Sequence, residues 1–318
     1  MLQDFFLSYV YAIIYTLIML AVVTYFFLKF DKNKHYFMPI YTPSPNYFYK
    51  EWNEENAIMI TYKNDNNDNA NDNNINGKTI TLHGYSSTPI KKILSSDIII
   101  LYFHGNAGNV YLRIPQFKEM VEKLNARYEY GNKGTTVREH VIIAFDYQGF
   151  GLSSGVPTSQ GILEDGMQIW RWCQSKFKQN KIILYGESIG TSVSAYVYLN
   201  SIPDGIILKS PFSSMHSLIS DWFHLPGFMR NIPRWFIPND FLTGIWLEKR
   251  IQSRYIWEKE DKNIPIVILH NKEDKLIPTR NIKELLHKYR SFALEGGHND
   301  CDIDIAWLNG CSYVLDKV

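Results

Sequence analysis

The chain has 318 residues, 45% of them hydrophobic, which suits one large α/β domain with a sizeable core. Its formal net charge of +1 gives no reason to expect a nucleic acid as a partner. The three cysteines are an odd number without metal-ligand spacing, which argues against a disulfide framework and a cysteine metal site.

The N-terminal stretch Phe5–Leu28 contains no charged residue and as a helix would be long enough to cross a bilayer. Only Asp4 is charged before it, whereas a cleaved signal peptide begins with basic residues. Residues 1–34 are therefore predicted to be an uncleaved anchor with one membrane-spanning helix, 5–28. Three lysines follow the helix and no Lys or Arg precedes it, which predicts a single-pass protein with its main domain in the cytosol (Lys29, Lys32, Lys34).

Residues 35–55 are rich in Tyr, Phe and Pro and are predicted to link the anchor to a domain at 56–318. Their aromatic side chains could lie at the lipid interface or pack on the domain, and both interpretations stay open. The runs Ala57–Tyr62 and Lys78–Tyr85 alternate in the manner of a hairpin. Between them, residues 64–76 are almost all Asn and Asp, which predicts a solvated, disordered insert.

Short apolar runs then alternate with amphipathic ones. The predicted strands are Asp97–Phe103, Val141–Asp146, Lys181–Tyr185, Gly205–Lys209, Ile266–His270 and Ser291–Leu294. The predicted helices are Val110–Leu124, Ile162–Lys178, Thr191–Leu199, Asn281–Tyr289 and Ile303–Leu315. This alternation predicts an α/β fold with a mostly parallel central sheet and helices on both faces.

Residues 210–262 interrupt the alternation with a segment rich in Trp, Phe and Pro. A segment inserted between two strands at this point is predicted to form a short aromatic cap over an active site at the edge of the sheet. The cap could line an apolar pocket for an acyl chain or could pack on its own aromatic side chains, and both interpretations stay open.

The segment Gly186-Glu187-Ser188-Ile189-Gly190 has the G-x-S-x-G pattern between a predicted strand and a predicted helix. That context is the one a nucleophile elbow requires, in which glycines permit close approach of strand and helix. Ser188 is therefore predicted to be the nucleophile, with its hydroxyl exposed at the tip of the turn.

A serine nucleophile needs a base, and the base needs an orienting acid, in the chain order Ser, acid, His. Asp274 and His298 each lie just past a predicted parallel strand, where active sites of open sheets collect. Glu273 is a rival acid and His270 a rival base, but Asp274 has the shorter side chain at a turn, and His270 precedes the acid. The predicted triad is Ser188, Asp274 and His298.

An oxyanion hole needs two backbone N–H groups aimed at one point. The first is predicted at Ile189, directly after the nucleophile, and the second at Asn106, in the loop after the strand Asp97–Phe103. Without Ser188, the same loop would be an ordinary β–α turn.

Other motifs argue against cofactor chemistry. Gly151–Gly155 also matches G-x-S-x-G, but Pro157 stands where a helix should open, so an ordered loop near the site is predicted. Gly149-Phe150-Gly151 resembles a dinucleotide fingerprint, but the third glycine is misplaced and no βαβ phosphate turn follows. The chain has no P-loop and no H-E-x-x-H pattern. Neither a cofactor nor a metal ion is expected.

Four motifs occur in order: His104–Asn109, Asp146–Gly151, Gly186–Gly190 and Gly297–Asp300. Together they resemble the membrane-anchored α/β-hydrolases related to the bud-emergence proteins, of the type of α/β-hydrolase domain-containing protein 13. The resemblance covers about residues 36 to 318. It implies the α/β-hydrolase fold and a serine hydrolase with the triad named above.

The resemblance also implies a substrate class, because related members remove palmitoyl groups from proteins and others hydrolyse lipid esters. The expectation is a membrane-anchored serine hydrolase of acyl thioesters or esters, with a palmitoyl-protein thioesterase favoured. The alternatives are a lipid esterase, acting on lysophospholipids or monoacylglycerols, and a non-catalytic scaffold. The expected partners are an acylated protein or lipid substrate and a membrane, with no nucleic acid.

Overall fold

The computed structural model describes residues 38–39, 54–64, 78–129, 139–222, 241–253, 264–300 and 303–318. Apart from Met38, these residues belong to one compact unit, Pro39–Val318. The predicted helix 5–28, most of the predicted linker 35–55 and nearly all of the predicted insert 64–76 lie outside these ranges. The predicted domain boundaries therefore stay predictions.

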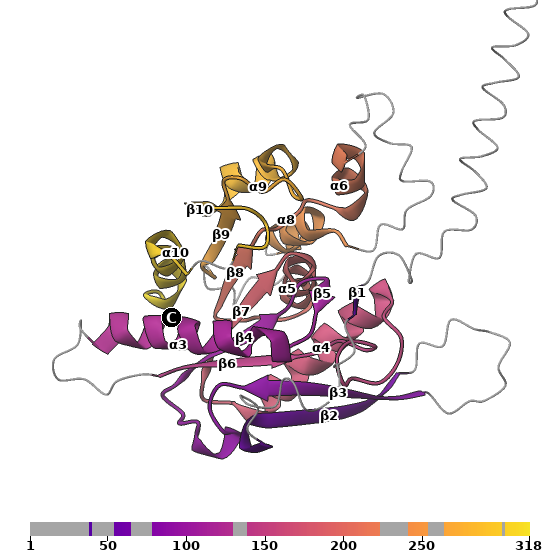
Figure 1. Cartoon of the computed structure of the whole chain (residues 1–318), viewed down its shortest axis with the longest axis vertical. Helices are drawn as coiled ribbons and strands as arrows, with labels where there is room; N and C mark the ends of the chain where they lie inside the picture. The colour runs from indigo at the N-terminus through magenta and orange to yellow at the C-terminus, as the bar shows by residue number, and fades with distance from the viewer. Residues whose placement is uncertain are drawn as a thin grey trace, which may run out of the picture. The chain divides into compact units, whose positions relative to one another are not determined.

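Eight strands form one sheet in the order β10-β9-β8-β7-β4-β6-β3-β2 (Figure 1). Their bounds are β2 Ala57–Asn64, β3 Lys78–Ser86, β4 Ile98–Phe103, β6 His140–Phe145, β7 Lys181–Glu187, β8 Gly205–Lys209, β9 Ile266–Asn271 and β10 Arg290–Leu294. The pairs β2–β3 and β3–β6 are antiparallel, and every other neighbouring pair is parallel. The prediction of a mostly parallel central sheet is confirmed. Two short strands, β1 (Met38–Pro39) and β5 (Ala107–Gly108), lie outside it.

Helices cover both faces of the sheet, as predicted (Figure 1). On one face, α3 (Ile114–Glu129) and α10 (Ile305–Leu315) share a buried apolar cluster with β4, β6, β7, β8 and β9. On the other face lie α4 (Ser159–Lys176) and α5 (Ile189–Asn200), and Trp172 of α4 meets the ring of Phe145 edge-on at 5.3 Å. The central strands are buried on both sides, which explains their continuous apolar runs.

Several helix bounds differ from those the sequence predicts. The predicted helix Val110–Leu124 begins as a 3-10 turn, η3 (Tyr111–Arg113), and continues as α3 to Glu129. The predicted helix Asn281–Tyr289 is the 3-10 turn η5 (Thr279–Ile282) followed by α9 (Lys283–Lys288). Of the predicted cap 210–262, the structure describes α6 (Met215–Trp222) and α8 (Thr243–Ser253), while 223–240 and 254–262 lie outside the described residues.

The prediction of a single-pass membrane protein is corrected here. In the part of the chain that the structure describes, no helix combines the length and the apolar composition that crossing a bilayer requires. The stretch 5–28, on which the prediction depended, lies outside that part. Membrane placement and the cytosolic orientation derived from it are therefore withdrawn.

At the junction of β7 and α5, backbone atoms of neighbouring segments approach one another very closely. A Cβ atom at position 190 would lie 2.0 Å from the carbonyl oxygen of Phe103, the last residue of β4. A Cβ atom at position 186 would lie 2.4 Å from the carbonyl oxygen of Gly190. Both contacts are far below van der Waals distance and involve backbone atoms, so the turn tolerates only glycine at these two positions.

Gly190→Ala is expected to lower the free energy of unfolding by on the order of 2–3 kcal/mol, because overpacking against backbone outweighs the helix propensity that alanine adds. The matched control is Gly244→Ala, also in the first turn of a helix, where the nearest atom to a Cβ lies at 3.5 Å. That control should be neutral or stabilising by up to about 1 kcal/mol. Chemical denaturation of the two variants measures both effects, and equal stabilities would contradict the prediction.

Candidate active site

Ser188 occupies the turn between β7 and α5 in a strained backbone conformation, with φ 53° and ψ −117°. Positive φ is unfavourable for a residue with a side chain and persists only where surrounding structure enforces it. The neighbouring strands hold Ser188 in this conformation. Strand β7 is paired with β4 and with β8, and the Ser188 amide donates to the Lys209 carbonyl at 2.9 Å. The hydroxyl of this part-exposed residue is held at the carboxyl edge of the sheet.

The structure brings Ser188, Asp274 and His298 together. His298 Nε2 lies 3.2 Å from Ser188 Oγ, and His298 Nδ1 lies 2.7 Å from Asp274 Oδ2. The contact with an ionised carboxylate places the single proton of a neutral imidazole on Nδ1, which leaves Nε2 free to accept the serine proton. The arrangement is that of a hydroxyl nucleophile, a base and an orienting acid.

The surroundings of Asp274 favour its ionised form. Its side chain is buried, which opposes ionisation, but the hydrogen bonds from His298 and from the backbone N–H of Ile277 outweigh burial and lower the pKa of this carboxyl. The loop that carries His298 has its own anchor, because Asp300 Oδ2 accepts the Gly297 amide. Asp274 is therefore more deeply buried than His298, whose side chain is 11% exposed.

The two rival residues differ from the predicted ones in their surroundings. The side chain of Glu273 is exposed, and its amide donates to the Gly296 carbonyl. His270 is buried at the end of β9, near Asp274 and His298, and burial lowers the pKa of its ring. In the second G-x-S-x-G segment, the buried Ser153 hydroxyl donates to the Asp146 carbonyl and accepts the His83 amide. Ser153 thus ties together an ordered loop.

The two predicted oxyanion-hole residues lie at the same edge of the sheet. Ile189 is the first residue of α5, so its amide belongs to the helix N-terminus beside Ser188. Asn106 follows Gly105, and a Cβ atom at Gly105 would lie 3.5 Å from the Ser188 Cβ. The loop after β4 therefore lies directly against the nucleophile turn.

Next to the turn lies a cluster of buried charges that was not predicted from the sequence. Glu187 Oε1 accepts from Lys209 Nζ at 3.1 Å, while its Oε2 accepts from the Tyr102 hydroxyl at 2.6 Å and lies 3.6 Å from Arg113 Nε. Burial opposes the ionisation of Glu187, but Lys209 and Arg113 outweigh it and lower its pKa to about 2. The lysine that ends the otherwise apolar strand β8 was the signal for this cluster.

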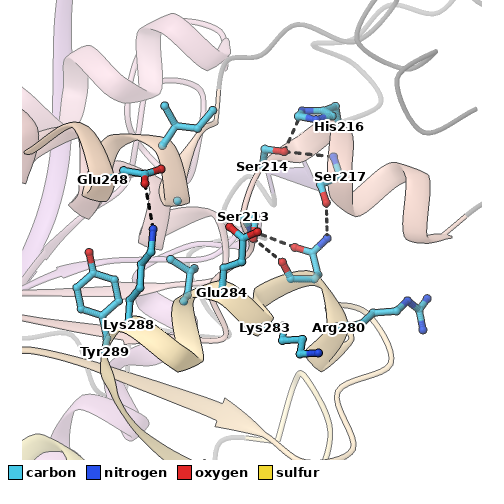
Figure 2. Close-up of a pocket in the computed structure, with 14 residues that line it drawn as sticks. Ser213, Ser214, His216, Ser217, Glu248, Arg280, Lys283, Glu284, Lys288 and Tyr289 are labelled. Carbon is cyan, nitrogen blue, oxygen red and sulfur yellow. Dashed lines mark hydrogen bonds and ion pairs between the residues drawn. The ribbon is translucent and has the colours of Figure 1, made fainter. Parts of the chain in front are cut away.

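A separate cavity of about 470 Å³ lies between α6, α8, η5 and α9 (Figure 2). Ser188, Asp274 and His298 are not among the residues that line it. Asn281 in its wall donates to the Ser217 hydroxyl at 3.1 Å, and Lys288 pairs with Glu248 at 3.0 Å. Among the described residues, no group of three or more His, Cys, Asp or Glu side chains could hold a metal ion.

Comparison with known proteins gives the fold. A profile described as the alpha/beta hydrolase fold matches residues 98–250. An esterase of known structure from Pyrococcus furiosus superposes with a TM-score of 0.54 at 14% identity, over 88% of this chain and 97% of that chain. The chain has the α/β-hydrolase fold, as the sequence predicts.

Several sequence relatives are lipases. The lysophosphatidylserine lipase ABHD12 of Danio rerio is 28% identical over 211 residues, which cover 61% of this chain and 48% of that protein. The ABHD12 lipase of Macaca fascicularis is 29% identical over 202 residues, which cover 58% of this chain and 44% of that protein. The chain spans about half the length of these curated relatives.

These relatives refine the predicted resemblance. The α/β-hydrolase fold stands, but the narrower assignment to the bud-emergence group and the type 13 protein is not supported, since the relatives named above are ABHD12 lipases.

Glu187→Gln is expected to reduce the free energy of unfolding at pH 7 by on the order of 3 kcal/mol, because Lys209 and Arg113 lose their shared carboxylate. The pKa of Glu187 falls from an ordinary 4.5 to about 2 on folding. Its contribution is therefore fully present above 4.5 and is lost as the pH falls toward 2. Denaturation of both proteins between about pH 2 and pH 7, which includes the range where the carboxylate titrates, measures the difference. A difference that grows on acidification would contradict this account.

Proposed function

We propose that this protein is a serine hydrolase that cleaves the carboxylic ester of a lysophospholipid. One observation carries the proposal: the chain of hydrogen bonds from Ser188 Oγ through His298 to Asp274. A scaffold would have no need of a strained nucleophile turn aligned with a base and an acid. No cofactor or metal ion takes part in the proposed reaction.

The proposed reaction follows from the geometry. Ser188 Oγ attacks the acyl carbonyl while His298 Nε2 takes its proton, and Asp274 stabilises the resulting imidazolium. The N–H groups of Ile189 and Asn106 would hold the tetrahedral oxyanion. Collapse of the intermediate breaks the ester C–O bond, and His298 returns the proton to the leaving alkoxide. Water, activated by His298 in the same way, then releases the fatty acid from Ser188.

One observation supports a lipid ester over a protein thioester: the curated relatives named above are lipases of a lysophospholipid. A site for the acyl chain, which both substrate classes share, is offered by Trp222 and Leu276. They are large apolar side chains with 43% and 44% exposure, and Trp222 Nε1 donates to the Leu276 carbonyl at 2.6 Å. Leu276 lies two residues after Asp274, so this exposed apolar pair could accept part of an acyl chain near the triad.

A fluorophosphonate probe is expected to label the full-length protein, and Ser188→Ala is expected to abolish labelling without lowering thermal stability. Alanine removes the nucleophile from a part-exposed position and leaves the fold intact. Ser153→Ala is the matched control, since it alters the serine of the other G-x-S-x-G segment and should keep the label. Persistent labelling of Ser188→Ala, or an unlabelled native protein, would exclude the proposed nucleophile and favour the scaffold interpretation.

A substrate panel is expected to separate the ester classes. Lysophosphatidylserine or lysophosphatidylcholine should be hydrolysed with a kcat/KM at least about tenfold above that of a palmitoylated cysteine peptide or a monoacylglycerol. Release of free fatty acid and of free thiol measures the two chemistries in parallel, with Ser188→Ala as the blank. Faster cleavage of the thioester would refute the lipid-ester proposal while leaving the serine mechanism in place.

A further inference from the structure

The side chain of Arg113 connects the loop after β4 with the nucleophile turn. Its Nη1 donates to the Asn109 carbonyl at 3.1 Å, and its Nη2 donates to the Ala107 carbonyl at 3.0 Å. Its Nε lies 3.6 Å from Glu187 Oε2. Since Glu187 immediately precedes Ser188, one guanidinium holds both the loop that carries Asn106 and the segment that carries the nucleophile.

The other side of this loop is also fixed. The Tyr147 hydroxyl donates to the His104 carbonyl at 3.1 Å, and His104 Nδ1 lies 2.7 Å from the Gly105 carbonyl. Burial and the nearby Arg113 lower the pKa of His104 to about 3, so its ring is neutral and donates through Nδ1. Because a trans peptide is planar, the Asn106 N–H points away from the bonded Gly105 carbonyl. The direction of this amide thus depends on how the loop carbonyls are held.

The chemistry of this contact suits arginine and no other cation. A planar guanidinium can bind two carbonyls and face a carboxylate at once, whereas a lysine ammonium would have to choose among them. Arg113 and Glu187 are only 15% and 13% exposed, so solvent screens their interaction little. Lys209 and Tyr102 fix the carboxylate from the other side, so the anchor for Arg113 is itself rigid.

We propose that Arg113 is a positioning residue for acyl transfer, which holds the Asn106 amide at its distance from Ser188. The inference rests on the proposed function, in which that amide stabilises the oxyanion. Loss of the guanidinium frees the carbonyls of Ala107 and Asn109, and the amide departs from the place where the transition-state charge develops. Ground-state binding of the acyl chain does not involve Arg113, so the effect falls on kcat.

The test compares Arg113→Met and Arg113→Lys in the full chain, with p-nitrophenyl butyrate as the substrate. Arg113→Met is expected to lower kcat on the order of 10- to 100-fold and to leave KM within about threefold of the native value. Arg113→Lys should recover part of the loss. Arg171→Met is the matched control, because Arg171 pairs with Glu164 at 3.5 Å on α4. It should leave kcat unchanged.

Hydrogen exchange supplies a second readout that does not need activity. Amides in the segment 104–110 should exchange faster in Arg113→Met than in the native protein or in Arg171→Met. A folded Arg113→Met variant with kcat within about twofold of native, or with only KM altered, would overturn the inference. If Arg113→Met does not fold, Arg113→Lys decides by the same criteria.

The two proposals fail in distinguishable ways. A native protein that neither hydrolyses the ester nor reacts with fluorophosphonate refutes the proposed function. In that case, unchanged exchange of 104–110 in Arg113→Met also refutes the positioning role of Arg113. An active native protein with an equally active Arg113→Met variant refutes the positioning role alone.

Discussion

The carbonyl oxygen of Phe103 stands where a side chain on residue 190 would have to be, and the rest of the site depends on this contact. Because strand β4 and helix α5 meet at backbone distance, the turn between β7 and α5 has no room to relax. Ser188 is consequently held at φ 53°, with its hydroxyl directed toward His298. The same contact brings the loop after β4 against the start of α5, so the predicted oxyanion donors come from two segments that cannot move apart independently.

A second constraint is electrostatic. Two cations, Arg113 and Lys209, and one carboxylate, Glu187, lie with little exposure beneath the nucleophile turn. Charges in such surroundings are costly unless each is paired and hydrogen-bonded, and here both conditions are met. Packing thus fixes the position of Ser188, and buried charge fixes the loop beside it.

Much of this arrangement could be predicted from the sequence because the signals were local. Continuous apolar runs such as β4 identified buried parallel strands, and two glycines around Ser188 identified a turn of closest approach. Asp274 and His298 could be singled out because each follows a strand whose carboxyl end reaches the same edge. Their approach within hydrogen-bond distance follows from the order of the strands, which local patterns do not encode.

The charge cluster had a weaker signal. Glu187 lies in the G-x-S-x-G motif, which predicts a role for the serine but none for the glutamate. Arg113 lies near the start of a predicted helix, where its position needed no further explanation. Only Lys209, a cation at the end of an apolar strand, was anomalous on its own. The narrower family assignment failed for a related reason: the four short motifs identify the shared fold, whereas the substrate class depends on the segments between them. The membrane-spanning prediction rested on composition in a stretch outside the described residues.

The three proposed catalytic side chains are attached to parts of the fold with unequal support. Ser188 sits between the central strand β7 and helix α5, whereas His298 follows β10, an edge strand with one neighbour and mostly exposed side chains. Edge elements open locally at a lower cost than the centre of a sheet. Heating would therefore separate the imidazole from the hydroxyl while the core stayed intact. Thermal inactivation of this protein would then report fraying of one sheet edge, at temperatures where circular dichroism still records a folded chain.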